Sequence, residues 1–313
     1  MKTAFLYAGQ GSQYKGMGRD LYEKYPAFRA AFDAAELPFD IHTVCFEDPD
    51  GLLSQTEYTQ PCMVAFACGV TAVLKENNLV PDMAAGLSLG EYSALEAAGV
   101  FDAKTAITLT AFRGRAMAEA GRGIETGMQA VLGMKEADLQ ACCDEASADG
   151  IVTISNYNCP GQLVIAGEKA AVEHCAALAK EKGAKRCIPL KVSGPFHTKL
   201  MAPAGDRLRE YFQTIPFGTM QFPVLFNTLG REKSETDTIP DLLVKQVQTS
   251  VHMDATIRRM MELGVDTFIE VGPGNALSGF VRKTARADGV KDFTIYNIQN
   301  AEDMEHVLSA LRK

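Results

Sequence analysis

The chain has 313 residues, of which 47% are hydrophobic, and its formal net charge is −8 at pH 7. This length and composition suffice for one large hydrophobic core, or for one core with a small inserted domain. The acidic balance argues against a nucleic-acid-binding protein, which normally has a basic excess, although a local basic patch could still dock an acidic partner.

Strands and helices are predicted to alternate in the first part of the chain. Buried strands are expected at 3–8 and 81–86, and a Gly-rich loop at 9–18 follows the first of them. Asp102 is of a residue type that caps the N-terminus of a helix. Helices are expected at 19–36, 59–78, 89–98 and 102–120.

A change of pattern follows a predicted linker at 121–127. The next segments predict the order strand, helix, strand, strand, helix, strand, which is that of a ferredoxin-like unit, at 128–133, 135–148, 151–157, 163–166, 169–182 and 186–190. Beyond them we expect helices near 199–213, near 251–263 and from about 275, with strands at 224–227 and 267–271. The prediction is an α/β fold with a large discontinuous domain, 1–124 and 194–313, interrupted by a small subdomain, 125–193.

Eight cysteines are present, and none of them forms a Cys-x-x-Cys pair. This spacing is not that of a zinc site, and a chain of this size does not depend on disulfides, so we expect reduced thiols in a cytoplasmic protein. The N-terminal apolar run is too short for a signal peptide, and no run of about 18 apolar residues predicts a membrane span.

Ser88 lies in Gly86-Leu87-Ser88-Leu89-Gly90, between a predicted short strand and a predicted helix. Gly-x-Ser-x-Gly in this context is typical of a nucleophile elbow, in which the glycines let two backbone segments approach closely. The helix N-terminus after the serine favours a developing oxyanion. The alternative is a tight turn that requires only small residues; the flanking strand and helix favour the nucleophile.

A serine hydroxyl needs a base that removes its proton. His197 is the best candidate of the five histidines, because it lies in a Gly-Pro loop at the predicted junction between the two domains. No Asp or Glu near it stands out as the third member of a catalytic triad. A backbone carbonyl could orient the imidazole instead.

Two further positions remain open on residue patterns alone. Gly9-x-Gly11 suggests a dinucleotide-binding loop, but Tyr14 stands where the third glycine belongs; the other interpretation makes Gln10 a side-chain donor to an oxyanion hole. Arg113, in Phe-Arg-Gly-Arg, predicts either an exposed helix face or a bidentate site for a carboxylate.

Six motifs together resemble those of the malonyl-CoA:acyl-carrier-protein transacylases. They cover essentially the whole chain in order: YAGQGSQ, GLSLGEYSAL, FRGRAM, NYNCPGQLVIAG, VSGPFHTKLM and FIEVGPGNALSGF. The family fold is a hydrolase-like, parallel-sheet α/β domain with an inserted ferredoxin-like (βαββαβ) subdomain. This agrees with the fold predicted above.

The resemblance implies a role for each candidate residue. Ser88 would be the acylated nucleophile, and His197 the general base and then the general acid. Gln10 and the backbone N–H of Leu89 would form the oxyanion hole, and Arg113 would hold the malonyl carboxylate.

The resemblance also concerns the residues around these groups. Gln248 would place its backbone carbonyl against His197, and Phe196 resembles the malonyl-selective members. Two positions depart from the commonest pattern: Leu87 stands where many relatives have His, and Ala8 where many have Pro. These departures affect the shape of the pocket and leave the reaction unchanged.

The implied reaction is ping-pong transfer of malonyl from malonyl-CoA to the phosphopantetheine thiol of an acyl carrier protein, which supplies fatty acid synthesis. It needs no cofactor or metal, and neither a nucleic acid nor a membrane is an expected partner. A polyketide-pathway acyltransferase, a serine hydrolase that clears carrier proteins and a non-catalytic scaffold remain alternatives. Basic residues that could dock an acidic carrier protein are Lys180, Lys182, Lys185, Arg186, Lys191 and Lys199.

Overall fold

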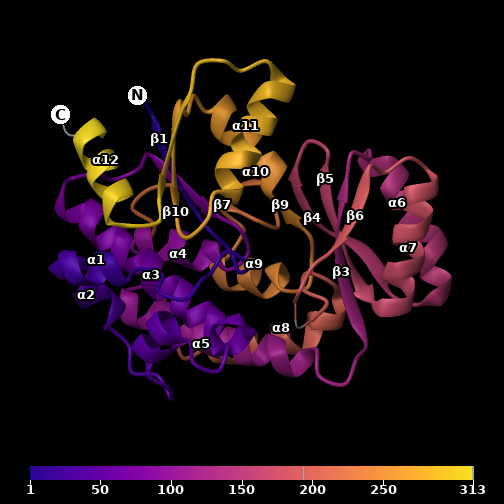
Figure 1. Cartoon of the computed structure of the whole chain (residues 1–313), viewed down its shortest axis with the longest axis horizontal. Coiled ribbons are helices and arrows are strands. Elements are labelled where there is room, and N and C mark those ends of the chain that lie inside the picture. The colour runs from indigo at the N-terminus through magenta and orange to yellow at the C-terminus, as the bar shows by residue number, and fades with distance from the viewer. Residues whose placement is uncertain (193, 312–313) are drawn as a thin grey trace.

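The computed structural model describes residues 1–192 and 194–311, and its two main β-sheets lie side by side with helices around each (Figure 1). The first sheet is entirely parallel, with strand order β11-β10-β1-β2. Its strands are β1 (Thr3–Tyr7), β2 (Met83–Gly86), β10 (Thr267–Val271) and β11 (Thr294–Ile298). The three strands β1, β2 and β10 are fully buried, as expected where helices cover both faces of a parallel sheet.

Alternate residues of β1 contact different layers. Phe5 and Tyr7 belong to the large cluster that contains α3, whereas Ala4 and Leu6 pack with α10 and α11 on the other face. The helices around this sheet are α1 (Arg19–Lys24), α2 (Pro26–Phe32), α3 (Thr56–Glu76), α4 (Gly90–Ala97), α5 (Ala103–Ala120), α8 (Ala202–Phe212), α9 (Ile239–Gln246), α10 (Met253–Glu262), α11 (Ala276–Asp288) and α12 (Ala301–Leu311).

The second sheet has the order β6-β3-β5-β4-β9. It is built from β3 (Thr126–Leu132), β4 (Val152–Cys159), β5 (Gln162–Glu168), β6 (Arg186–Pro189) and β9 (Val251–His252). The helices α6 (Glu136–Ala146) and α7 (Lys169–Glu181) complete the chain order βαββαβ, with the first four strands antiparallel. The predicted fold class, a parallel-sheet α/β domain with an inserted ferredoxin-like subdomain, is confirmed.

One strand of the second sheet comes from outside the predicted insert. β9 pairs with β4 in parallel, through Asn156 with Val251 and Tyr157 with His252. The sequence pattern predicted a helix from 251, and α10 begins only after this strand, at Met253. Through β9, a segment of the predicted large domain is hydrogen-bonded to the ferredoxin-like sheet.

Several short elements differ from the predicted ones. The helix expected at 19–36 is divided into α1 and α2 at Pro26, because proline has no N–H to continue the helical hydrogen bonds. Elements that were not predicted include the helix α9, the strands β8 (Arg231–Glu232) and β11, and a π-helical turn at Thr43–Glu47. β7 (Leu225–Phe226) is shorter than expected and pairs with β8.

The described residues do not include the last residues of the two predicted domains. Ser193, the last residue of the predicted insert, and the C-terminal Arg312 and Lys313 lie outside the described residues. In the part of the chain that is described, no helix is both long enough and apolar enough to cross a membrane.

Candidate active site

Ser88 lies at a strained turn between β2 and α4. Its φ is 51°, a left-handed conformation that is uncommon for a residue other than glycine. A Cβ on Gly86 would lie 1.9 Å from the carbonyl carbon of Gly90, and a Cβ on Gly90 would lie 2.1 Å from the carbonyl oxygen of Tyr7. Both glycines are therefore required for this turn, and the turn is the nucleophile elbow that the sequence predicts.

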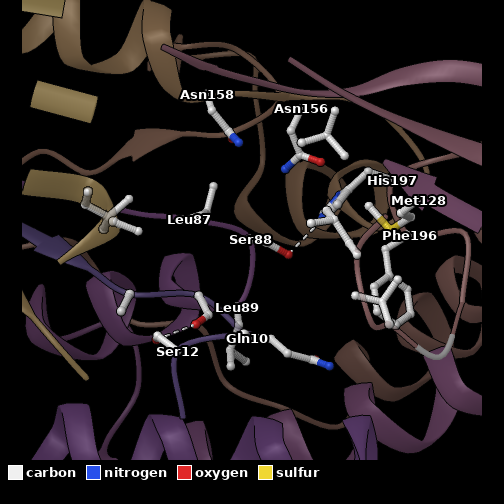
Figure 2. Close-up of a pocket in the computed structure, with 18 of the residues that line it drawn as sticks. Gln10, Ser12, Leu87, Ser88, Leu89, Met128, Asn156, Asn158, Phe196 and His197 are labelled. Carbon is white, nitrogen blue, oxygen red and sulfur yellow. Dashed lines mark hydrogen bonds between the residues drawn. The ribbon is translucent and has the colours of Figure 1, made fainter. Parts of the chain in front are cut away.

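His197 lies directly against the serine (Figure 2). Its Nε2 is 2.8 Å from Ser88 Oγ, and its Nδ1 is 2.7 Å from the backbone carbonyl oxygen of Gln246. A carbonyl can only accept, so Nδ1 carries the proton and Nε2 is free to accept the proton of the serine hydroxyl. The sequence-predicted nucleophile and base are thus brought together.

The charge state of His197 suits a base. The side chain is buried, and burial together with the nearby positive charge of Arg113 lowers its pKa from 6.5 to about 4. The carbonyl of Gln246 opposes this shift, because it stabilises the protonated ring. The imidazole is therefore neutral at neutral pH and able to accept a proton.

The prediction that Gln248 supplies the carbonyl is wrong. Gln246, the last residue of α9, supplies it, whereas the side chain of Gln248 donates to the carbonyl of Val244. The error of two residues arises because α9 was not predicted, so the end of the helix could not be placed. The sequence carried a signal for this helix in Thr238, a residue type that often caps helices, and in the structure Thr238 accepts a hydrogen bond from the N–H of Asp241.

Arg113 is buried and contacts the nucleophile, which excludes an exposed helix face. Its Nη2 donates to Ser88 Oγ at 3.2 Å and to Gln246 Oε1 at 2.9 Å, and its Nη1 donates to Gln60 Oε1 at 2.8 Å. The guanidinium carbon lies 5.1 Å from the centre of the Tyr92 ring. A fixed, desolvated guanidinium beside the serine is suited to bind a carboxylate on an acyl group.

The side chain of Gln10 is not directed at the serine. Its amide donates to Thr56 Oγ1 at 3.0 Å, so the prediction of a side-chain donor at this position is wrong. Gln10 and Leu89 both line the cavity at Ser88, and within residues 1–192 and 194–311 neither backbone N–H has a hydrogen-bond partner. These two N–H groups are therefore available to form an oxyanion hole.

Four buried polar residues around the elbow were missed by the sequence analysis. Three of them, Gln60, Asn227 and Gln246, bind Ser88 or Arg113, and the fourth, Glu91, accepts the backbone N–H of Asn227. Gln60 and Glu91 lie in otherwise apolar helical stretches, a pattern that could have marked them. Asn227 and Gln246 have no comparable signal.

The cavity at Ser88 has a volume of about 320 Å³ and two different walls (Figure 2). One wall, the elbow wall, consists of the elbow, the 9–12 loop, Arg113 and His197, and the other, the sheet wall, is the second sheet, with Met128, Ala130, Asn156, Asn158 and Val164. Such a largely apolar cavity with a few convergent polar groups is typical of a small-molecule site. In the described ranges, no group of three or more His, Cys, Asp or Glu side chains could hold a metal ion.

Comparison with known proteins gives a consistent result. Residues 4–313 match a family model described as acyl transferase domain. The chain is 42% identical to the malonyl CoA-acyl carrier protein transacylase of Bacillus subtilis, over 91% of each chain. It is similar to the crystal structure of the Clostridium perfringens malonyl CoA-acyl carrier protein transacylase, with a TM-score of 0.94, 39% identity, and coverage of 100% and 98% of the two chains.

A second similar structure is that of a malonyl-transacylase in complex with a type II PKS acyl-carrier protein. Its TM-score is 0.93 and its identity 35%, over 99% of this chain and 100% of that one.

Proposed function

Because this chain belongs to the malonyl-CoA:acyl-carrier-protein transacylases of the acyl transferase domain family, we propose that Ser88 and His197 carry malonyl from malonyl-CoA to the phosphopantetheine thiol of an acyl carrier protein. The product supplies fatty acid synthesis. The observation that carries the site assignment is that one hydroxyl, Ser88 Oγ, lies within hydrogen-bond distance of both a neutral imidazole and a buried guanidinium.

The first half-reaction acylates the serine. Ser88 Oγ attacks the thioester carbonyl carbon while His197 Nε2 takes the hydroxyl proton. The carbonyl oxygen becomes an oxyanion, which accepts hydrogen bonds from the backbone N–H groups of Leu89 and Gln10. The C–S bond then breaks, and His197 returns its proton to the sulfur of the leaving coenzyme A.

The second half-reaction reverses these roles. The carrier thiol gives its proton to His197, and the resulting thiolate attacks the carbonyl carbon of the Ser88 ester. The same two N–H groups stabilise the second tetrahedral oxyanion. Ser88 Oγ leaves and recovers its proton from His197. In both halves the Gln246 carbonyl stabilises the imidazolium, the role that an acid has in a triad.

Arg113 accounts for the selection of malonyl. The malonyl carboxylate can pair with its guanidinium in a site without solvent, where a charge-assisted hydrogen bond is strongest. An acetyl group offers no such partner. A hydrolase that clears acyl groups in general would have no use for this buried cation, so the transacylase is the better interpretation.

The acceptor has a second candidate. One similar structure is a complex with a type II PKS acyl-carrier protein, which makes a polyketide carrier the second candidate acceptor for this chain. The fatty-acid carrier is the first choice, because the named relatives over most of the chain are malonyl CoA-acyl carrier protein transacylases.

Three further features complete the proposal. The large domain is 1–124 with 194–313 and the small subdomain is 125–193, which is supported by four strands of the second sheet falling within 126–189. The chain acts without a cofactor, because its own residues supply nucleophile, base and oxyanion donors. It acts in the cytoplasm, where its eight free cysteines would stay reduced.

The experiment is intact mass spectrometry of the pure protein after incubation with malonyl-CoA or acetyl-CoA. We expect wild type to gain one malonyl group from malonyl-CoA and to react far more slowly with acetyl-CoA. The Ser88→Ala variant should gain no malonyl group. An adduct that persists in Ser88→Ala, or no malonyl uptake by wild type, would contradict the proposal.

A further inference from the structure

The backbone N–H of Ser88 does not face the cavity. It donates to Asn227 Oδ1 at 2.6 Å, and the Nδ2 of the same carboxamide donates to the carbonyl oxygen of Gly86, also at 2.6 Å. One side chain therefore binds two backbone groups of the elbow, one on the nucleophile and one two residues before it. We propose that Asn227, held in turn by Glu91, is a positioning residue that keeps Ser88 in its strained, reactive backbone conformation.

Glu91 anchors Asn227 from the helix that follows the elbow. The backbone N–H of Asn227 donates to Glu91 Oε2 at 2.6 Å, and both residues are completely buried. Asn227 directly follows β7, whereas Glu91 lies in the first turn of α4, three residues after Ser88. The contacts close a ring from the elbow through Asn227 and Glu91 back to the elbow.

Burying the carboxyl group of Glu91 costs folding free energy, which is unfavourable for a residue with a purely structural role. Burial raises the pKa of its carboxyl to about 8, and in the described part of the chain its Oε1 has no hydrogen-bond partner. Packed apolar residues usually stabilise a core at least as well as a buried, half-satisfied acid. The acid is therefore better explained by the geometry it imposes on Asn227 than by the stability it adds.

We call Asn227 and Glu91 together the clamp, and the strained backbone of Ser88 explains why the clamp is needed. A left-handed backbone at a non-glycine residue persists only where its surroundings determine it, and here the bond from Ser88 N–H to Asn227 is part of those surroundings. The bond also means that the Ser88 N–H is not available to an oxyanion. A relaxed elbow would move Oγ away from His197 Nε2, and a displacement of about 1 Å can cost about 100-fold in rate.

The test compares variants of the clamp in two reactions. The first is single-turnover acylation by malonyl-CoA; the second is modification of Ser88 by a small sulfonyl fluoride, which needs neither coenzyme A nor Arg113. We expect Asn227→Ala to slow both by about 100-fold with the KM for malonyl-CoA changed less than about threefold. Asn227→Asp keeps an acceptor for the Ser88 N–H but loses the donor to Gly86, and should retain an intermediate rate.

Two controls separate positioning from folding. Thr284→Val removes a partly buried hydrogen bond to Asp254, between two residues that do not line the cavity, and should lower stability while leaving both rates unchanged. Glu91→Gln keeps an oxygen acceptor for the Asn227 N–H and should recover most of the rate that Glu91→Ala loses. The comparison of Glu91→Gln with Glu91→Ala also tests the proposal if Asn227→Ala does not fold.

The inference rests on the proposed function but can fail separately from it. Wild-type rates in folded Asn227→Ala, or a loss that only matches the unfolded fraction, would overturn the clamp. If wild type takes up no malonyl while the sulfonyl fluoride still distinguishes the variants as expected, the clamp stands and the proposed substrate fails.

Discussion

The two walls of the cavity are built in opposite ways. The elbow wall contains Ser88 and His197, two of the four non-glycine residues with positive φ in the described chain, and it holds the buried charge of Arg113. The sheet wall is formed by β3, β4 and β5, with no such backbone strain. Its strand β4 carries two register shifts, next to the cavity-lining Asn156 and Asn158.

This contrast shows where the site needs fixed geometry. Bond making and proton transfer depend on tenths of an ångström, so the elbow wall accepts strain and buried polar groups to hold Oγ, Nε2 and the guanidinium together. Binding a flexible thioester arm depends on shape and a few polar contacts, which regular strands supply. We therefore expect changes in the elbow wall to lower rates and changes in the sheet wall to raise KM.

The largest expected effect comes from a comparison of two histidines, one in the elbow wall and one in the second sheet. His197→Ala should slow acylation by about 10³-fold, because general acid–base catalysis is lost. His252→Ala removes a ring that stacks on Tyr157 at 4.8 Å in the second sheet, outside the cavity, and should change the rate little. The measurement is the burst of coenzyme A release. Equal losses in both variants would break the contrast.

The next comparison concerns glycines and stability. Gly90→Ala places a Cβ 2.1 Å from the carbonyl oxygen of Tyr7 and should lower the free energy of unfolding by about 3 kcal/mol, the upper part of the range for overpacking. Gly127→Ala in β3 meets Val172 only at 3.4 Å, an ordinary contact, and should cost less than about 1 kcal/mol. Urea unfolding measures both, and a Gly127 cost equal to that of Gly90 would contradict the account.

Arg113→Met should act on selectivity and on the base. Losing the charge-assisted pair should reduce the preference for malonyl-CoA over acetyl-CoA by about 10- to 100-fold. The positive charge of Arg113 helps to lower the pKa of His197 to about 4, so its removal raises that pKa. The acid limb of kcat/KM for acetyl-CoA should therefore move from near pH 4 towards pH 6.5. An acid limb that stays in place would exclude this electrostatic coupling.

The smallest expected effect tests the sheet wall. Asn158 is nearly buried, and its Oδ1 has no hydrogen-bond partner among the described residues. Asn158→Ala should raise the KM for malonyl-CoA by about 3- to 10-fold, the effect of one neutral hydrogen bond, with kcat nearly unchanged. Steady-state kinetics distinguish the two constants. A loss that falls mainly on kcat would place this residue with the chemistry instead.

The sequence predicted the parts of the site that depend on local patterns. Ser88 is marked by its flanking glycines within a strand–turn–helix context, and His197 by its loop at the domain junction. Gln246 and Asn227 reach Ser88 from 158 and 139 residues away, so no local pattern could place them. Gln248 was assigned by resemblance alone, whereas the end of α9, which was not predicted, decides that the carbonyl of Gln246 faces His197. Gln10 was misjudged because only packing fixes its side chain on Thr56.

The most direct test of the central claim is the fate of the malonyl-enzyme. Protein loaded with malonyl-CoA, freed of excess donor and mixed with holo-acyl carrier protein, can be followed by the mass of both proteins over time. The account predicts that Ser88 keeps its malonyl group in buffer alone and passes it to the carrier thiol within the time of mixing. Rapid loss of malonyl to water, with none on the carrier protein, would contradict it and identify a hydrolase.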